Sequence, residues 1–157
     1  GSGDANSMAF WQQQKGNHPG RVSINLTFDE KFSHRLFSAA DVLLVPSLYE
    51  PCGLTQMIAL TYGTLPIVRK TGGLADTVKD WDEENHYGFD HGNGFSFYDY
   101  TGYALYKSVE RAISVFKLKD VWRKIQKNGM KQDFSWKRSA EQYLDLFEKV
   151  LAIRQSG

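Results

Sequence analysis

The sequence predicts an α/β fold, a parallel sheet with helices on both faces. Short apolar runs alternate with segments in which apolar residues recur at helical spacing, as expected when helices cross over between parallel strands. The clearest runs are Val42–Val45, which Pro46 ends, and Leu65–Arg69. A continuous apolar run of this length is typical of a strand buried on both faces. The spacing of apolar residues therefore indicates the fold class.

The first half of the chain supplies one more expected strand and two expected helices. Arg21–Leu26 alternates apolar and polar residues as a strand does. Glu30–Ala40 has apolar residues at helical intervals, with Asp29 available as its cap. Leu54–Tyr62 also reads as a helix, and Gly63 is placed to end it. Because this helix follows a strand, the loop before it is expected at the carboxyl edge of the sheet.

The second half is expected to be mainly helical. A helix over Leu74–Lys79 and a strand over Gly94–Tyr98 flank the polar, turn-rich residues 80–93, which read as a loop. Three helices should follow, at about 101–117, 119–130 and 137–154. The last has one apolar face, made of Ala140, Tyr143, Leu144, Phe147, Val150 and Leu151.

Composition favours one soluble domain over residues 1–157. Apolar residues make up 41% and charged residues 24% of the chain, which is ordinary for a globular protein. The formal net charge of +1 argues against nucleic-acid and membrane-surface partners, which select a basic excess. A single cysteine excludes an intrachain disulfide and favours a reducing compartment. With no signal-peptide pattern and no apolar run of membrane-spanning length, a location in the cytosol or in the stroma of an organelle is predicted.

Two loops at the expected carboxyl edge are candidates for ligand binding, since parallel sheets bind ligands there. In Pro46–Gln56, the N–H groups of Gly53, Leu54 and Thr55 would face outward at a helix start, where they suit a phosphate. The Thr55 hydroxyl would add a hydrogen bond. The alternative for this loop is an ordinary helix start with a structural glycine. The second loop is Lys70–Leu74.

The side chains beside these donors indicate which ligand would bind. Glu50 would avoid a phosphate and would accept hydrogen bonds from neutral hydroxyls, or steady positive charge on a reacting carbon. Together the two features fit a sugar nucleotide. Cys52 has two interpretations, a nucleophile with a lowered pKa or a small contact residue. Gly72 and Gly73 would let backbone approach a ligand, although the P-loop spacing is absent.

No metal site is expected. Histidines 18, 34, 86 and 91 lack ligand spacing, and one cysteine cannot complete a structural zinc site. The acidic run Asp80–Glu84 lacks the glycine and terminal glutamate of a calcium loop. These residues read as surface features.

Several blocks, in order along nearly the whole chain, resemble the bacterial glycogen synthases and plant starch synthases. They are GSGD (1–4), HPGRV (18–22), FSHRLFSAADVLLVPSLYEPCGLTQ (32–56), YGTLPIVRKTGGLADTV (62–78), GFSF (94–97) and DFSW (133–136). The resemblance implies a retaining glucosyltransferase with the GT-B architecture, two Rossmann-like domains around a cleft. Such enzymes move glucose from ADP-glucose, or sometimes UDP-glucose, to the non-reducing end of an α-1,4-glucan, without a metal.

The resemblance also implies roles for the edge residues. It makes Glu50 the acid near the donor glucose, where it hydrogen-bonds sugar hydroxyls and helps to hold the reacting geometry. It lays the backbone of Cys52, Gly53 and Leu54 along the sugar, with Leu54 and Thr55 reaching the donor phosphate. In this picture Cys52 is a contact residue.

The same resemblance assigns the remaining donor-site residues and shows one departure. Family enzymes usually have a tyrosine, stacked on the nucleotide base, where this chain has Phe28. Phenylalanine keeps the stacking face and loses the hydroxyl, so ADP-glucose and UDP-glucose both stay open as donors. Gly72 and Gly73 match the glycine turn that lines the cleft.

Relative to this family, the chain reads as most of the C-terminal, donor-binding domain, with its first strands missing. It lacks the N-terminal domain with the acceptor groove, and GSGD matches a loop that follows a later strand of the second domain. We therefore expect negligible activity from the fragment alone and possible self-association through an exposed sheet edge. The alternatives are a non-catalytic nucleotide-sugar or glucan-binding module, and another GT-B transferase such as a sucrose- or trehalose-type synthase.

Overall fold

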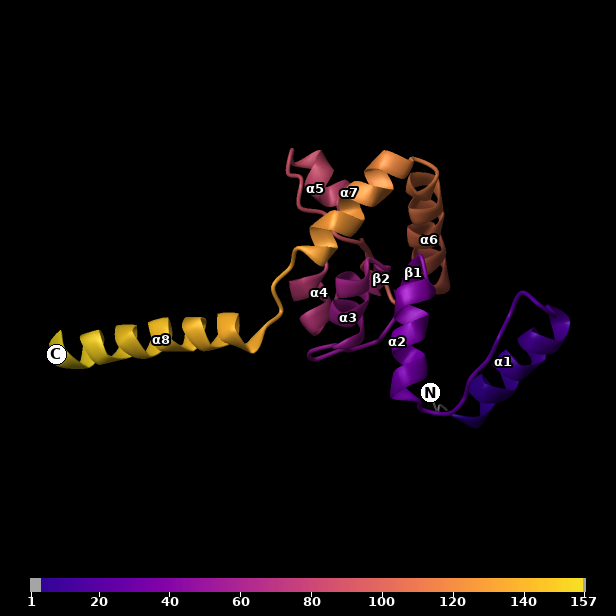
Figure 1. Ribbon diagram of the computed structural model, residues 1–157, viewed down its shortest axis with the longest axis horizontal. Coiled ribbons are helices and arrows are strands. Elements are labelled where there is room, and N and C mark those ends of the chain that lie inside the picture. The colour runs from indigo at the N-terminus through magenta and orange to yellow at the C-terminus, as the bar shows by residue number, and fades with distance from the viewer. Residues whose placement is uncertain (1–3, 157) are drawn as a thin grey trace. The chain divides into compact units, whose positions relative to one another are not determined.

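A parallel sheet organises the protein, as the sequence predicts (Figure 1). The structure is a computed structural model that describes residues 4–156. In those residues the sheet has three strands, β1 (Val42–Val45), β2 (Leu65–Arg69) and β3 (Phe95–Phe97), in the order β1-β2-β3. Both neighbouring pairs are parallel, with Val42 opposite Leu65 and Ile67 opposite Phe95. All three strands therefore end at the same edge.

The contacts divide the chain into two compact units, Gly1–Leu36 and Phe37–Gly157. The first contains α1 (Ala5–Asn17) and the larger part of α2 (Glu30–Ala39), and the whole sheet lies in the second. A single domain over residues 1–157 stays a prediction. The loop expected at GSGD falls mostly on residues 1–3, outside the described residues.

In the first unit, one prediction is confirmed, one is wrong, and one helix was not predicted. The cap of α2 is confirmed, since Asp29 Oδ1 accepts a hydrogen bond from the N–H of Phe32 at 2.9 Å. The strand expected over Arg21–Leu26 is wrong, because none of the described residues pairs with this segment as a neighbouring strand. The missed helix, α1, is capped by Asp4, whose side chain accepts from the N–H of Ser7 at 3.0 Å. Hydrogen bonds from Ser7 lower the pKa of Asp4.

In the second unit, helices connect the strands and the chain then becomes helical. The helix after β1 is α3 (Thr55–Tyr62), which ends at Gly63 with φ +80° as predicted. The helix after β2, α4 (Gly72–Thr77), begins two residues before the expected start at Leu74. The remaining helices are α5 (Trp81–His86), α6 (Gly102–Phe116), α7 (Lys119–Met130) and α8 (Trp136–Ser156).

The loop predicted over residues 80–93 is wrong in its first half, where α5 forms. The side chain of Asp80 accepts hydrogen bonds from the N–H groups of Asp82 and Glu83 and so caps this helix. Acidic residues in the first turn also interact favourably with the positive end of the helix dipole. The acidic run thus helps to begin a helix.

The core surrounds β2, whose residues are buried up to Val68. On one face, Leu65 and Ile67 pack with Phe95 and with residues of α6 and α7, among them Ala112, Trp122 and Ile125. On the other face, Val68 packs with Leu74 and Val78. This alternation confirms helices on both faces of the sheet. β1 is an edge strand, and the side chain of Leu44 there is 49% exposed.

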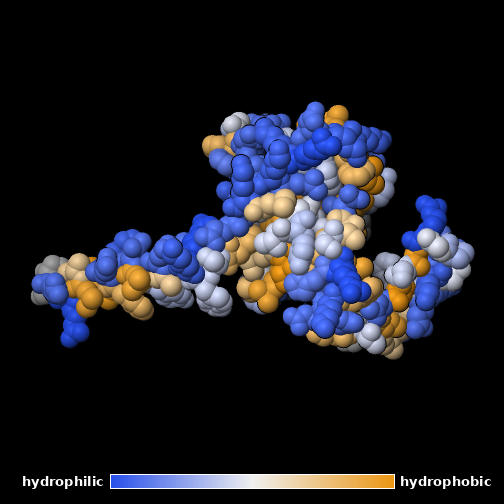
Figure 2. Space-filling view, in the orientation of Figure 1, coloured by the Kyte–Doolittle hydropathy of each residue, from blue (hydrophilic) through white to orange (hydrophobic). Residues whose placement is uncertain are grey.

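The last helix, α8, keeps its apolar face uncovered. No side chain described on it is buried, and apolar side chains are visible along it (Figure 2). Its large exposed apolar residues include Tyr143, Leu144, Phe147, Val150 and Leu151. Among the described residues, no helix combines the length and the hydropathy needed to cross a bilayer.

Candidate functional site

The two predicted loops lie in contact at the carboxyl edge of the sheet. The N–H of Gly73, at the start of α4, donates to the carbonyl oxygen of Glu50 at 2.9 Å. A Cβ added to Gly72 would stand less than 3.0 Å from the Glu50 oxygen, and one added to Gly73 less than 3.0 Å from the oxygen of Cys52. Glycine is therefore required here by the approach of two protein backbones. The expected contact of Gly72 and Gly73 with a ligand stays a prediction.

The start of α3 offers unused hydrogen-bond donors. Gly53 has φ +69°, a left-handed conformation that suits glycine, and it turns the chain into the helix. Leu54 occupies the cap position, and no side chain within residues 4–156 caps the helix. The N–H groups of the first turn have no helical partner, and the helix dipole favours an anion beside them. Thr55, the first helical residue, is exposed and makes no side-chain hydrogen bond among the described residues.

The buried side chain of Gln56 stabilises the start of α3, a role that we did not predict from the sequence. Its side chain is buried, and Nε2 donates to the carbonyl oxygen of Gly53 at 2.7 Å and to Oγ1 of Thr77 at 3.0 Å. Thr77 Oγ1 in turn donates to the carbonyl oxygen of Gly73 at 2.6 Å. The signal in the sequence was a polar residue on the inward face of the first helical turn.

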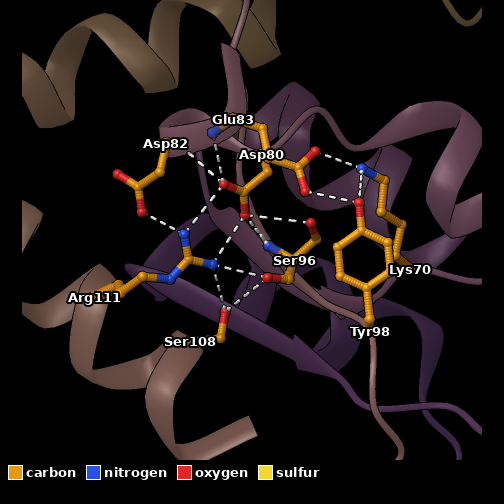
Figure 3. Close-up of polar contacts among 8 residues, drawn as sticks. All are labelled: Lys70, Asp80, Asp82, Glu83, Ser96, Tyr98, Ser108 and Arg111. Atoms are coloured by element: carbon orange, nitrogen blue, oxygen red, sulfur yellow. Dashed lines mark hydrogen bonds and ion pairs between the residues drawn. The ribbon is translucent and has the colours of Figure 1, made fainter. Parts of the chain in front are cut away.

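Two cationic side chains at the end of β2, Arg69 and Lys70, hold neighbouring segments in place at the carboxyl edge of the sheet. Arg69 Nε donates to the carbonyl oxygen of Ser47 at 3.0 Å, and its guanidinium also donates to the carbonyl oxygens of Leu48 and Tyr98. Lys70 Nζ forms an ion pair with Glu83 and contacts the hydroxyl of Tyr98 at 2.9 Å (Figure 3). Burial alone would lower the pKa of Lys70, but its hydrogen bonds to Glu83 and Tyr98 raise it above the ordinary value.

Glu50 is the acid at the centre of this edge. It is half-buried, and its carboxylate makes no hydrogen bond or ion pair within the part of the chain that the structure describes. Cys52, two residues later, is an exposed free thiol. A hollow of about 520 Å³ lies beside Cys52, Leu54 and Met57 and extends toward residues 132–142. Glu50 and Thr55 are not among the residues that line this hollow. The Glu50 carboxylate, unpaired among the described residues, and the N–H groups of the first turn of α3 suit a ligand that has both hydroxyl and anionic groups.

The structure brings most of the predicted site residues together. Those at the edge are Glu50, Cys52, Gly53, Leu54, Thr55, Gly72 and Gly73. Phe28 belongs to the first unit, where its side chain is 85% exposed, so its stacking on a base stays a prediction. No group of three or more histidine, cysteine or acidic side chains in residues 4–156 could hold a metal ion.

A second polar cluster, which we call the Asp80 cluster, consists of Asp80, Asp82, Ser96, Ser108 and Arg111 (Figure 3). Arg111 Nη2 and Nη1 lie 3.0 and 3.1 Å from the two carboxylate oxygens of Asp80. Burial alone would raise the pKa of Asp80, but the hydrogen bonds and charge of Arg111 lower it below the ordinary value. The cluster joins α5, β3 and α6, and it satisfies its own charges. We therefore assign it a structural role.

Most of the chain matches a known protein family and several curated proteins. The family described as glycosyl transferases group 1 matches residues 14–129. A glycogen synthase of Desulfitobacterium hafniense is 42% identical over 151 residues, covering 96% of this chain and 32% of that protein. One from Geotalea uraniireducens is 45% identical over 152 residues, covering 97% and 31%. The chain thus spans about a third of the length of these curated relatives.

Solved structures show the same relationship. The catalytic domain of starch synthase IV from Arabidopsis thaliana, bound to ADP and acarbose, matches with a TM-score of 0.80 and 37% identity, covering 94% of this chain and 30% of that one. A sucrose-phosphate synthase from Thermosynechococcus elongatus matches with a TM-score of 0.66 and 27% identity, covering 98% and 38%. The starch synthase is thus the more similar of these two.

Proposed function

The chain belongs to the glycosyl transferases group 1 family, and on that premise we propose that it is the donor-binding part of a glucosyltransferase of the glycogen and starch synthase kind. The observation that carries the proposal is the start of α3, where no side chain caps the helix and the carboxylate of Glu50 makes no hydrogen bond among the described residues. Anion donors beside a hydroxyl-binding acid suit a sugar joined to a diphosphate.

We propose ADP-glucose as the donor, with UDP-glucose as the alternative. The relatives at 42–45% identity are glycogen synthases, and the starch synthase IV structure contains ADP. In this chain the diphosphate would lie at the N–H groups of Leu54 and Thr55, and the backbone of Cys52 and Gly53 would follow the sugar. Gly72 and Gly73 would line the cleft, and Phe28 would stack on the base.

In the proposed reaction, glucose moves with retention of configuration from the nucleotide to the non-reducing end of an α-1,4-glucan. Glu50 would accept hydrogen bonds from sugar hydroxyls and orient the donor. The first turn of α3 would stabilise the charge that develops on the departing diphosphate, because its donors are fixed before the reaction begins. We assign the step to these groups without a metal, and we assign Cys52 a contact role.

The acceptor glucan would bind mainly to parts of the relatives' length that this chain does not span. Transfer needs both substrates oriented and shielded from water, so this chain by itself should have negligible synthase activity. We place the protein in the cytoplasm if it is bacterial, like the relatives above, and in the plastid stroma if it comes from a plant.

Self-association of this chain is a further part of the proposal. β1 is an edge strand of the sheet in the described part of the chain, and a hollow of about 380 Å³ beside it is lined by apolar residues that include Leu44, Ile113 and Phe116. Free edges and apolar surface both favour pairing with another chain. Light scattering over a range of concentrations tests this, and a monomer throughout would contradict it.

The decisive experiment is Glu50→Ala in a full-length transferase that carries this sequence, assayed for glucose transfer from ADP-glucose. We expect turnover to fall about a hundredfold or more, with Glu110→Ala, an exposed acid on α6, as the unaffected control. A tenfold change corresponds to only about 1.4 kcal/mol of barrier, so turnover within tenfold of wild type would contradict the role of Glu50. Calorimetric titration of this chain with ADP and ADP-glucose tests donor binding separately and distinguishes a binding module from an inert fragment.

A further inference from the structure

We propose that Arg69 is a positioning residue for Glu50, an inference that rests on the proposed function. Arg69 is the last residue of β2 and is partly buried. Its guanidinium donates to three carbonyl oxygens from two segments, those of Ser47 and Leu48 after β1 and that of Tyr98 after β3. One side chain thus ties the loop that carries Glu50 to a strand on the far side of β2.

Arg69 holds the backbone just before the acid, and Gly73 holds the backbone of the acid itself. Leu48, which accepts from Arg69, lies two residues before Glu50, and the carbonyl oxygen of Glu50 accepts from the N–H of Gly73 at 2.9 Å. The Glu50 carboxylate makes no hydrogen bond or ion pair of its own among the described residues. Its place at the edge therefore depends on how firmly the backbone around it is held.

The contacts require arginine geometry. Three nitrogens of one planar group each reach a different carbonyl oxygen, whereas lysine offers a single nitrogen at the end of a flexible stem. No ion pair with a carboxylate involves Arg69 within the described part of the chain, and its guanidinium lies 5.6 Å from the ring centre of Tyr100. The role we assign is thus geometric.

Charge and geometry can be separated by substitution. Arg69→Lys keeps the positive charge and loses the planar group with its three donor nitrogens, and Arg69→Gln loses both. If Arg69 positions Glu50, both variants of the full-length transferase should lower kcat by about ten- to a hundredfold, the loss expected from misplacing a catalytic group. KM for ADP-glucose should change less than about threefold, because the phosphate donors on α3 remain. Arg123→Gln, an exposed arginine on α7, is the matched control.

Two kinetic outcomes would overturn the inference. One is a kcat within about threefold of wild type in both variants. The other is a wild-type kcat in Arg69→Lys together with a raised KM for ADP-glucose in Arg69→Gln, which would assign Arg69 a direct charge contact with the diphosphate. If Glu50→Ala itself leaves turnover intact, the proposed function fails instead, so the two failures are distinguishable.

A second measurement needs no activity. Amide hydrogen exchange in this chain reports how firmly the N–H of Gly73 is held on the Glu50 carbonyl. We expect Arg69→Lys and Arg69→Gln to speed exchange at Gly73 about tenfold while the amides of β2 keep their wild-type rates. Unchanged exchange at Gly73, or an equal increase throughout β2, would contradict a local positioning role.

Discussion

The Asp80 cluster and the start of α3 both contain charged or polar groups in the second unit, and they differ in what those groups contact. Asp80 is buried, and both of its carboxylate oxygens accept hydrogen bonds from Arg111. At the start of α3, no side chain caps the helix, and the carboxylate of Glu50 makes no hydrogen bond among the described residues. The polar groups of the first region bond to one another, whereas the Glu50 carboxylate and the first-turn N–H groups of α3 have no partner among the described residues.

The comparison distinguishes polar groups that stabilise the fold from polar groups that are available to a ligand. A buried ion pair that loses one partner leaves an uncompensated charge, so the cost falls on folding. Groups that are already positioned but unused lose nothing in stability when altered, so the cost falls on the ligand. The two regions should therefore respond in opposite ways to matched substitutions.

The largest effect on stability is expected from Asp80→Asn. The substitution leaves the partly buried Arg111 without its main carboxylate, and we expect a loss of about 3 kcal/mol of unfolding free energy. For a chain of this size the midpoint of thermal unfolding should fall by about 6–12 °C. Asp82→Asn, which removes a more exposed partner of the same arginine, should cost less than about 1 kcal/mol. Equal losses in the two variants would remove the contrast.

Gly73→Ala should lower both the stability of the chain and its affinity for ADP. We expect a loss of about 2 kcal/mol of unfolding free energy and about tenfold weaker ADP binding. The new methyl group would press on the carbonyl of Cys52, which is backbone and can move only with its loop. Gly102→Ala is the matched control, since a Cβ there meets nothing within 4 Å. Thermal unfolding and calorimetry measure the two quantities. An ADP affinity within threefold of wild type would show that the contact between the loops does not shape the site.

A smaller, pH-dependent effect should follow from the Asp80 cluster alone. Arg111 holds the pKa of Asp80 below its ordinary value of 3.8 in the folded chain, so the unfolded chain binds this proton first as the pH falls. The stability from this group is complete above the unfolded pKa and is lost as the pH falls through 3.8 toward the folded value. Urea unfolding at a series of pH values should therefore show a shallower acid loss in Asp80→Asn than in wild type. Parallel curves would contradict the assigned pairing.

The smallest effects are expected from two threonines at helix starts. Thr101 caps α6 by accepting from the N–H of Ala104 at 3.1 Å, whereas the Thr55 hydroxyl makes no hydrogen bond among the described residues. Thr101→Val should cost about 1 kcal/mol of stability and leave ADP affinity unchanged. Thr55→Val should leave stability unchanged and weaken ADP binding about fivefold, near 1 kcal/mol. If both variants changed the same quantity, the distinction between the regions would fail.

The sequence predicted the elements that depend on local signals. β1, β2 and α3 follow from apolar spacing, and Gly63 ends α3 as expected. The placement of the two predicted loops at one edge of the sheet also follows, because parallel strands end at the same edge.

The parts that were missed depend on residues far apart along the chain. Asp80 caps α5 and pairs with Arg111, 31 positions later, and Arg69 bonds to Ser47, 22 positions earlier. Arg21–Leu26 has the alternation of a strand, but alternation does not supply a neighbour to pair with. A local sequence pattern does not show contacts between residues so far apart along the chain, so these contacts became visible only in the folded structure.

The thiol of Cys52 provides a labelling site at the start of α3 that can report ligand binding there. It is the only cysteine of the chain, and it is exposed on the loop between Glu50 and α3. A maleimide dye would therefore attach at one known position without any engineering of the protein. The rate of that attachment, with and without ADP, would measure occupancy of the edge by competition and would require neither an acceptor nor turnover.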